Sequence, residues 1–434
     1  MSITPKEQPM TEISERPEQY DVVVAGAGPA GMMTGLCLAL QGVAVAVLET
    51  APSAARTFRG ESISPDSVTA LRRLGVLDQL PADRTMPVSG IRIVDAGQEV
   101  LTVRFSELAD AEESPLEIPQ DSLLDAIDAA AARFPSFRLI RGASVQELIR
   151  RGPRIVGVRY RIGEDENTIT ARVVVAADGR YGKLGAAAGL VSRKQPMRRD
   201  FLWFKVDPPA GWDLTRYQVH LADDAHVMCI PTVPGILRLG VNIPPGGLSR
   251  IRKAGLPSLY SSVARIVPDL GEATEHSVRT WRDTSMLEIF SSRCPRWSIP
   301  GLVLVGDAAH TLTPVLAQGV NHAILDAVVL GDQLGPALRA EESDIFVDER
   351  CRIFQELREP HVDQARALQF RQESAFAQSG ALPTLARRSL YRTIDRLPVT
   401  KNAIWGRLYY SLAGGRNPAA EALDRLVARI PQTV

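Results

Sequence analysis

The chain has 434 residues, of which 45% are hydrophobic and 23% are charged. This length and composition allow two or three structural regions with an ample core. The 50 basic and 50 acidic residues cancel, so the net charge gives no general attraction to nucleic acid or to a membrane.

The N-terminal residues 1–19 are polar and charged, and we expect them to form a disordered arm. They lack the apolar core and the small-residue cleavage site of a secretory signal. Residues 22–48 carry no charge and are long enough to span a membrane. Gly26, Gly28, Gly31 and Pro29 in that stretch argue against a span, so no transmembrane segment is expected.

A strand, a tight turn and a helix are expected next. β-Branched residues at 22–24 lead into the spacing Gly26-x-Gly28-x-x-Gly31, and an apolar stretch follows at 32–40. In such a motif Gly26 allows a sharp turn, Gly28 lets the backbone approach a pyrophosphate, and Gly31 permits close helix–strand packing. The helix N-terminus offers unpaired N–H groups to an anion. The pattern predicts a dinucleotide-binding loop.

A second strand is expected at residues 43–48, directly before Glu49. This acid lies about 20 residues beyond the glycines, where a carboxylate accepts hydrogen bonds from adenosine ribose hydroxyls. A glycine-rich turn alone occurs in many α/β proteins. The combination with Glu49 is what favours a bound dinucleotide.

The rest of the chain alternates between helical and strand patterns. Helical patterns occur at residues 65–74, 120–134 and 318–334. Strand patterns occur at residues 90–94, 138–140, 145–149, 155–162, 171–177 and 302–305. Residues 200–295 alternate in strand fashion around Pro/Gly turns, and helices are expected after residue 335.

The four cysteines lie far apart, at Cys37, Cys229, Cys294 and Cys351. They lack the close spacing of a zinc site and the density of a disulfide framework. We therefore expect no metal site and a reduced, cytoplasmic compartment.

Three motifs occur in an order that is typical of one family. They are Gly26-x-Gly28-x-x-Gly31, Asp178-Gly179 after a strand, and Gly306-Asp307 at the start of GDAAHTLTPVLAQGVN. From about residue 20 to 370 the chain resembles the p-hydroxybenzoate-hydroxylase-fold (group A) family of FAD-dependent monooxygenases, with some likeness to the flavin-dependent halogenase branch. The resemblance implies an α/β fold with a Rossmann-like FAD-binding domain of the GR2 type, an inserted, mainly antiparallel β-sheet substrate domain, and C-terminal helices.

The resemblance also divides the chain into regions. The FAD-binding domain is expected at residues 20–87, 116–198 and 296–335. The substrate-binding sheet is expected at residues 88–115 and 199–295, and a C-terminal helical region at residues 336–434.

The Gly306-Asp307 motif is implied to meet the flavin directly. Asp307 would reach a ribityl hydroxyl of FAD, and Gly306 would let the chain pass close to it. Residues 314–321 would then turn into a helix whose first N–H groups favour the anionic reduced flavin. Ala317 stands where glycine is common in the family, a change that should leave the helix start intact.

Two further contacts with FAD follow from the resemblance. Segment 59–65 resembles an arginine-bearing stretch that family members place against the FAD pyrophosphate, so Arg59 is expected at the phosphate or flavin. Gln120 occupies the helix start where the family has an Arg or Gln that contacts FAD. The full set expected to bind FAD is Gly26, Gly28, Pro29, Ala30, Gly31, Glu49, Arg59, Gln120, Asp178, Gly179, Gly306, Asp307, Gln318, Gly319, Val320 and Asn321.

The electron donor implied by the resemblance is NADPH or NADH. After Asp178-Gly179 the family often has a serine and then an arginine that are linked to the nicotinamide cofactor and FAD. Those positions are Gly182 and Gly185 here, with Lys183 as a candidate replacement. Reduction by a separate reductase therefore stays open.

The implied reaction is hydroxylation of a phenol or indole ring by O₂ through a flavin C4a-hydroperoxide. The protein would position the ring, exclude water and polarise the reacting groups. Catalytic candidates are Pro314 at the flavin edge and His220 or His226, which could help to deprotonate a ring hydroxyl. Trp203 and Cys229 are expected to line the same substrate pocket.

A flavin-dependent halogenase is one alternative. Halogenases capture hypohalous acid with a lysine and carry a Trp-x-Trp-x-Ile-Pro sequence. Residues 78–100 contain no lysine, with Val88 near its expected position, and the comparable segment reads HVMCIP at residues 226–231. Saturation of isoprenoid double bonds by a flavin reductase is a second alternative, and a non-enzymatic FAD-binding factor is the weakest.

The C-terminal residues 381–434 are basic, with nine Lys/Arg against three acids. Apolar residues such as Leu385, Leu390 and Ile394 recur there at helical spacing. One interpretation is an ordinary helical cap with a solvated basic face. The other is a docking surface for an acidic partner or anionic lipid, in which case the aromatic group would be attached to a carrier or polypeptide. The expected partners are otherwise O₂ and a small aromatic substrate, with no nucleic acid.

Overall fold

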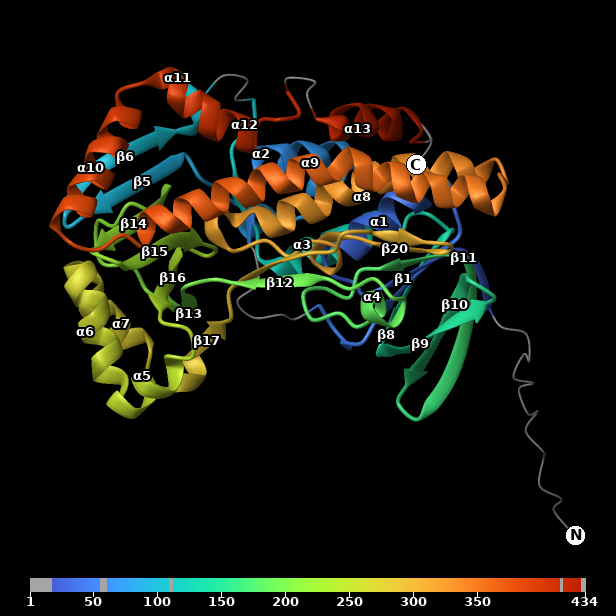
Figure 1. Ribbon diagram of the computed structural model, residues 1–434, viewed down its shortest axis with the longest axis horizontal. Helices are drawn as coiled ribbons and strands as arrows, with labels where there is room; N and C mark the ends of the chain where they lie inside the picture. Colours follow the sequence, from blue (N-terminus) through green and yellow to red (C-terminus); the bar gives the residue numbers. More distant parts are fainter. Residues whose placement is uncertain (1–17, 55–60, 109–111, 414–416, 431–434) are drawn as a thin grey trace, which may run out of the picture.

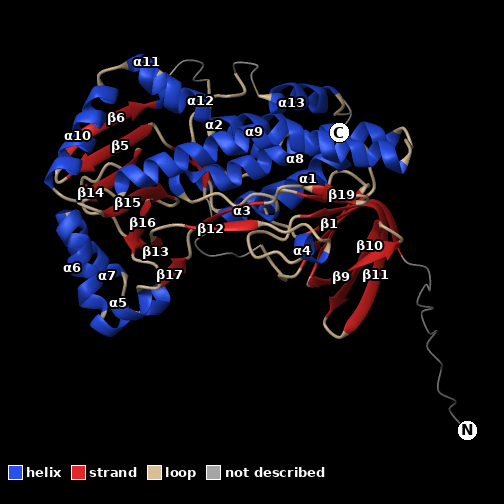
Figure 2. Cartoon of the chain, viewed as in Figure 1, coloured by secondary structure: helices blue, strands red, loops and turns tan. Residues whose placement is uncertain are grey.

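A computed structural model of the chain describes residues 18–54, 61–108, 112–413 and 417–430. Two β-sheets lie side by side under a layer of long helices (Figures 1 and 2). Residues 1–17 of the predicted arm and Arg59 lie outside the described residues. Glu18 and Gln19, the last two residues of the predicted arm, already belong to the first strand.

The first sheet has the strand order β19-β20-β11-β1-β2-β8. These strands are β1 (Glu18–Ala25), β2 (Val45–Glu49), β8 (Phe137–Arg141), β11 (Asp165–Ala176), β19 (Ser298–Ile299) and β20 (Leu302–Leu304). The pairs that β1 forms with β2 and β11 are parallel, as are β2–β8 and β11–β20. Parallel strands are covered on both faces, and residues 22–24 and 173–175 supply the unbroken valine runs that such strands need.

A hairpin of β9 (Ala143–Arg151) and β10 (Arg154–Ile162) joins this sheet through β11. The hairpin is as predicted, but β11 starts at Asp165 and not near residue 171. Its first half pairs antiparallel with β10, and its second half runs parallel to β1 in the core. The added residues are mostly polar because the first half is largely solvent-facing, and this hides the strand in the sequence.

Helix α1 (Pro29–Ala39) is buried between this sheet and α8 (Gln318–Arg339). A Cβ added at Gly331 would lie 2.5 Å from the Cβ of Cys37, so the crossing of these two helices requires a glycine. The other main helices are α2 (Pro65–Arg73), α3 (Gln120–Ala131), α4 (Leu184–Ala187), α9 (Asp344–Phe376) and α13 (Pro418–Ala428). None of the helices in the described part of the chain is long and apolar enough to cross a membrane.

The second sheet has the order β17-β13-β16-β15-β14-β5-β6. Its strands are β5 (Gly90–Asp95), β6 (Gln98–Arg104), β13 (Asp200–Val206), β14 (Arg216–Ala222), β15 (Ala225–Thr232), β16 (Ile236–Ile243) and β17 (Thr284–Leu287). All neighbours are antiparallel except β14 and β5, which confirms a mainly antiparallel inserted sheet.

The two faces of the second sheet meet different neighbours. One face packs against the short helices α5 (Leu248–Ala254), α6 (Leu256–Ile266) and α7 (Gly271–Ser277). On the other face Phe201, Trp203 and Met228 form an apolar cluster with Ile289, which directly precedes β18 (Phe290–Arg293). We call this second side the inner face because β18 leads back to the first sheet.

Short elements join the sheets and complete the fold. β3 (Ser62–Ile63), β7 (Leu116–Glu117) and β4 (Met86–Pro87) form a small sheet, and β12 (Arg193–Pro196) pairs with β18. At the C-terminal end, α10 (Ala381–Asp395) packs on β6 and is followed by α11 (Pro398–Lys401) and α12 (Arg407–Tyr409). The predicted α/β fold with C-terminal helices is confirmed.

Candidate active site

The glycine fingerprint forms the turn between β1 and α1. Gly26 has φ 109°, and a Cβ there would lie 2.4 Å from the carbonyl oxygen of Ala177. A Cβ at Gly31 would lie 1.9 Å from the Gly26 carbonyl oxygen. Gly28 is the N-cap of α1 and supplies no side-chain cap, and Pro29 follows as the first helical residue. The first turn of α1 therefore keeps N–H groups that an anion can use.

Glu49 ends β2 and holds the fingerprint loop. Its two carboxylate oxygens accept hydrogen bonds from the N–H groups of Ala27 (2.8 Å) and Ala51 (2.9 Å). A carboxylate oxygen can accept more than one hydrogen bond. The position at the carboxyl end of a parallel strand is therefore compatible with the predicted contact to ribose, in addition to this role in the loop.

The Gly306-Asp307 motif lies against the fingerprint, although 275 residues separate Gly31 from Gly306 in the chain. Gly306 is left-handed (φ 58°), and a Cβ there would lie 3.0 Å from the Cβ of Ala30. A Cβ at Gly319, in the first turn of α8, would lie 4.0 Å from Oδ1 of Asp307. Three predicted segments, from α1, the Asp307 turn and α8, thus meet at one place.

Arg180 is a site residue that the sequence interpretation missed. Its Nε lies 3.6 Å from Oδ2 of Asp307, and its guanidinium lies 5.6 Å from the ring centre of Phe290. The only signal in the sequence was a basic residue directly after Asp178-Gly179. Arg180 connects the Asp307 turn with β18 and so with the inner face.

The structure explains one departure from the family pattern. Asp178 accepts a hydrogen bond from the N–H of Leu184 at 2.9 Å, and burial raises the pKa of its carboxyl group. A Cβ at Gly182 would lie 2.3 Å from this carboxyl group. Gly182 therefore makes room for the Asp178 side chain, and a serine does not fit at this position without a shift. Gly179 is left-handed, with φ 78°.

The start of α8 is intact with alanine at position 317, as predicted. Leu316 and Ala317 both adopt left-handed backbone angles, with φ 64° and 51°. Asn321 supports this turn, because its side chain donates to the carbonyl oxygens of Ala317 and Ser62 and accepts from the N–H of Ser64. Gln318 donates to the carbonyl oxygen of Leu316. These two side chains hold the turn, while Gly319 and Val320 contribute first-turn backbone.

Pro314 lies directly before this turn, and α9 contacts the backbone on both sides of it. Gln369 of α9 donates to the carbonyl oxygens of Thr313 (2.9 Å) and Val315 (2.7 Å) and accepts from the N–H of Thr313. Gln369 is a second residue that the sequence interpretation missed. Its side chain fixes the backbone on both sides of Pro314.

Gln120 is the first residue of α3 and is buried. Its Oε1 has no hydrogen-bond partner among the described residues. A buried amide oxygen without a partner costs free energy unless a ligand satisfies it. This observation fits the predicted contact with a cofactor.

A buried charged network lies behind the Asp307 turn. Asp326 of α8 accepts hydrogen bonds from the N–H of Gly306 (3.1 Å), from Nε2 of His310 (2.7 Å) and from Arg358 of α9 (2.8 Å). Arg358 also contacts Nδ1 of His322 at 3.0 Å. Despite burial, His310 and Arg358 hold the pKa of Asp326 below its usual range. His310 therefore supports the turn through Asp326.

The inner face of the second sheet holds aromatic and unpaired polar groups. Trp203 and His226 both contact Phe201, with ring centres 5.7 and 5.2 Å apart. Among the described residues, Nε1 of Trp203 and both ring nitrogens of His226 have no hydrogen-bond partner. Burial and nearby arginines lower the pKa of His226 to about 3, so its imidazole is neutral. Gly240 of β16 lies opposite Trp203 of β13, and a Cβ at Gly240 would lie 2.7 Å from the Trp203 ring.

His220 and Cys229 lie on the opposite face, which corrects the expectation of one shared pocket. Cys229 packs in the cluster beneath the short helices, and His220 contacts Trp212. Side chains alternate along a strand, so His226 and Cys229, three residues apart on β15, point to opposite faces. Burial raises the pKa of the Cys229 thiol and lowers that of His220 to about 4.

A buried polar cluster lies beside the inner face. Arg238 of β16 lies 3.5 Å from Glu61 and 3.6 Å from Glu117, and its guanidinium is 5.5 Å from the Trp203 ring centre. Glu117 accepts a hydrogen bond from the Tyr217 hydroxyl at 2.8 Å. Burial raises the pKa of Glu117 to about 7, although Arg238 opposes this rise. Sequence patterns gave no indication of this cluster.

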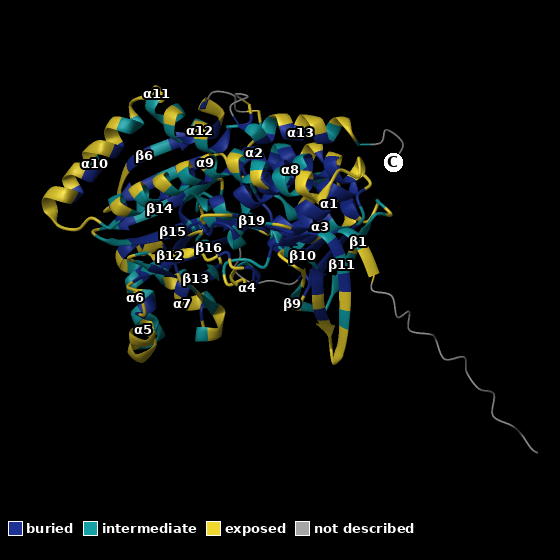
Figure 3. Cartoon of the chain, turned by 45° about the vertical axis from the view of Figure 1, so that its right-hand side comes forward, coloured by how far each residue is buried: buried dark blue, intermediate teal, exposed yellow. Residues whose placement is uncertain are grey.

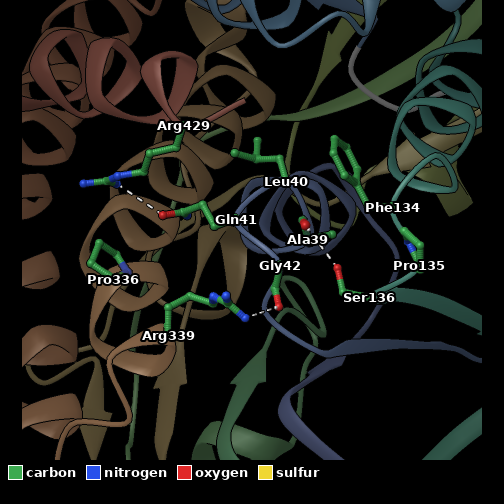
Figure 4. Close-up of a pocket in the computed structure, with 10 residues that line it drawn as sticks. All are labelled: Ala39, Leu40, Gln41, Gly42, Phe134, Pro135, Ser136, Pro336, Arg339 and Arg429. Atoms are coloured by element: carbon green, nitrogen blue, oxygen red, sulfur yellow. Dashed lines mark hydrogen bonds between the residues drawn. The ribbon is translucent and has the colours of Figure 1, made fainter. Parts of the chain in front are cut away.

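A surface pocket of about 560 Å³ lies elsewhere, at the C-terminal end of α1 (Figure 4). Arg429 and Arg339 border it and hydrogen bond with Gln41 and with the Gly42 carbonyl oxygen. The glycine fingerprint is at the opposite end of α1, about 16 Å away along the helix axis. This pocket is therefore separate from the site described above.

Comparison with known proteins matches residues 19–359 to the family described as FAD binding domain. The chain is a member of the p-hydroxybenzoate-hydroxylase-fold family of FAD-dependent monooxygenases. It is 28% identical over 386 residues to the 6-methylpretetramide 4-monooxygenase of Streptomyces rimosus, an alignment that covers 88% of this chain and 91% of that protein.

Two solved structures show the same fold. The p-nitrophenol 4-monooxygenase PnpA from Pseudomonas putida has a TM-score of 0.75 and 19% identity, covering 94% of this chain and 99% of that chain. The flavin-dependent brominase Bmp2 has a TM-score of 0.74 and 17% identity, covering 94% of this chain and 98% of that chain. The second match agrees with the predicted likeness to the halogenase branch.

Family membership makes this chain an FAD-dependent monooxygenase with NAD(P)H as the electron donor typical of the family. The residues present fit FAD. The uncapped start of α1 suits a pyrophosphate, and Oε1 of Gln120 is a buried acceptor without a partner among the described residues.

Proposed function

We propose that this monooxygenase hydroxylates a phenol or indole ring, using O₂ and NADPH or NADH. The observation that carries the proposal is the pair of buried side chains Trp203 and His226, which are 7% and 4% exposed and both contact the Phe201 ring. Their ring nitrogens have no hydrogen-bond partner among the residues that the structure describes. Buried polar groups are rarely left unpaired unless a ligand uses them. An aromatic substrate with an oxygen substituent would pack against the aromatic rings of this face. Its oxygen would also provide a hydrogen-bond partner for the ring nitrogens of Trp203 and His226.

Bound FAD would take electrons from the nicotinamide and activate O₂ for transfer to the ring. We propose that residues 20–87, 116–198 and 296–335 hold it. The α1 start would bind the pyrophosphate, Glu49 the ribose, and Gln120 and Asp307 the rest of the cofactor. The first N–H groups of α8 would stabilise negative charge on the flavin. Segments 88–115 and 199–295 would hold the substrate.

The side chains that face the substrate would orient its ring and form hydrogen bonds with it, without forming a covalent bond. Trp203 can only donate a hydrogen bond, and a neutral His226 can accept one from a ring hydroxyl, which increases electron density on the ring carbon. Pro314, held between the two carbonyl oxygens that Gln369 fixes, would limit the approach of the ring from the flavin side. The aromatic walls would exclude water from the reaction.

We propose a free small molecule as substrate, because six of the basic C-terminal side chains already have partners within the chain. These are Arg387, Arg388, Arg392, Lys401, Arg425 and Arg429. A carrier-bound substrate is the alternative that an assay must include. The four cysteines are buried free thiols, which supports a cytoplasmic location.

The test is anaerobic reduction of the purified, FAD-loaded protein by NADPH or NADH, with and without phenols and indoles. We expect one aromatic class to accelerate flavin bleaching, and oxygenated product to form when air is admitted. His226→Phe should lose this acceleration, while His276→Phe, which replaces a histidine outside the site, should keep it. Flavin that stays oxidised with every free aromatic would contradict the proposal. Activity that appears only with a carrier-bound ring would favour the carrier alternative.

A further inference from the structure

Helix α10 and the first turn that follows it, with α11, carry several apolar side chains that are exposed. Five of the eleven large apolar side chains that are exposed among the described residues fall within residues 382–399. They are Leu382, Leu385, Leu390, Leu397 and Val399. Figure 3 shows α10 exposed along the outer edge of the molecule. We call these five residues the outer apolar stripe.

The inner side of α10 is held by buried polar groups as well as by apolar packing, in which Tyr391 and Ile394 contact a hydrophobic cluster. Thr384, Arg387 and Tyr391 are its buried residues. Arg387 is almost fully buried and pairs with Asp95 of β5 at 2.8 Å. It also donates to the carbonyl oxygens of Asp223 and Gln378 at 3.0 Å. Because charge and hydrogen bonds fix this side inward, α10 cannot rotate to hide the leucines.

Positive charge surrounds the outer apolar stripe. Arg392 and Arg396 are exposed within the same segment, and Arg407 is exposed on α12, which follows α11 in the chain. Among the described residues, Arg396 and Arg407 form no ion pair. The one acid of this segment, Asp395, pairs with Lys401 at 2.9 Å. The exposed surface of α10 and α11 is therefore both apolar and cationic.

We propose that this surface docks on an anionic lipid bilayer, with α10 lying in the plane of the interface. An interfacial helix combines an apolar face with flanking Lys or Arg and does not span the membrane. Each basic residue gains from the negative potential of anionic headgroups. The arginines have long stems that reach a headgroup while the leucines enter the acyl boundary.

Two other occupants fit less well. A second copy related by a two-fold axis would place the same arginines opposite one another, and like charges repel. An acidic protein partner would match the charge, but protein interfaces are enriched in aromatic side chains, and the outer apolar stripe contains only leucine and valine.

The test is co-sedimentation of the full, FAD-loaded chain with lipid vesicles. Vesicles of phosphatidylcholine with about one-third phosphatidylserine should bind the protein roughly tenfold more than pure phosphatidylcholine, and added salt should weaken this binding. Leu382→Ser should reduce binding about tenfold, since a leucine leaves the acyl boundary. Ile345→Ser is the matched control, because Ile345 on α9 is 83% exposed and Leu382 is 79% exposed.

A second pair of variants tests the charge. Arg396→Gln should weaken binding to the anionic vesicles about fivefold, and Arg151→Gln, on the distant β9–β10 hairpin, should leave it unchanged. Bound flavin and circular dichroism confirm that each variant is folded. Three results would overturn the proposal: no preference for anionic vesicles, equal losses for Leu382→Ser and Ile345→Ser, or a dimer in sedimentation velocity that Leu382→Ser dissociates.

Discussion

Two buried tryptophans, Trp203 on the inner face of the second sheet and Trp297 in the core of the first sheet, should differ in their effects on stability and on activity. Nε1 of Trp297 donates to the carbonyl oxygen of Cys294 at 3.1 Å, whereas Nε1 of Trp203 has no partner among the described residues. We therefore expect Trp203→Phe to keep the free energy of unfolding within about 1 kcal/mol and to lose most of the aromatic acceleration of flavin reduction. Trp297→Phe should lose stability. Urea denaturation and anaerobic reduction measure the two effects, and equal stability losses would contradict this assignment.

Gly182 is a second residue at which the local geometry makes a definite prediction. Gly182→Ala puts a methyl group where the Asp178 carboxyl group lies, so we expect a loss of about 1–3 kcal/mol and weaker FAD retention. Gly185→Ala is the matched control, because a Cβ there meets its nearest atom at 3.4 Å. Thermal unfolding with and without added FAD measures both. A stable, FAD-retaining Gly182→Ala variant would show that the Asp178 side chain can move.

At the scale of elements, α8 and α9 hold the Asp307 turn through one buried ion pair. Arg358→Ala would leave the buried carboxylate of Asp326 without its arginine partner, and breaking a buried ion pair typically costs about 3–5 kcal/mol. Arg352→Ala removes an exposed arginine of the same helix and should cost less than about 1 kcal/mol. Chemical denaturation and the fluorescence of released flavin follow the two effects. Similar values for both variants would mean that Asp326 does not depend on Arg358.

Elements with a strong local pattern were predicted best. The start of α3 at Gln120 and the start of α8 at Gln318 agree with the sequence, because each begins at a Pro, Gly or turn signal. The length of β11 was wrong because the partner strand, and not its own apolar pattern, determines its first half. His220 and Cys229 were misplaced for a related reason. A shift of one residue in a strand exchanges its two faces, and only the observed register decides between them.

For the whole molecule, the contact of Glu117 in the small sheet with Arg238 in the second sheet predicts a dependence of stability on pH. Burial raises the pKa of Glu117 from 4.5 to about 7, so the folded state binds this proton more tightly than the unfolded chain does. The contribution of Glu117 to stability is therefore fully present below pH 4.5 and is lost as the pH rises through about 7.

The variant Glu117→Gln should remove this dependence, since glutamine resembles the protonated acid. Near pH 5 the variant and the parent should have similar free energies of unfolding, and above pH 8 the variant should be more stable by up to about 3 kcal/mol. Glu107→Gln, on the surface, is the control and should give parallel curves. Urea titrations across this pH range provide the measurement. A variant that loses stability at high pH would show that Arg238 needs the charge on Glu117.

The sequence by itself determined the nature of the cofactor and the family. The glycine fingerprint, the acid after the second strand and the Gly306-Asp307 motif are local requirements of the backbone, so each is visible in a short segment. Tertiary structure alone decided which side chains meet across the sheets. Arg180 beside Asp307, Glu117 beside Arg238 and the outward leucines of α10 depend on strand register and on contacts between distant segments. Such contacts cannot be predicted from one short stretch of sequence, because the free energy of each contact depends on two residues that are far apart in the chain.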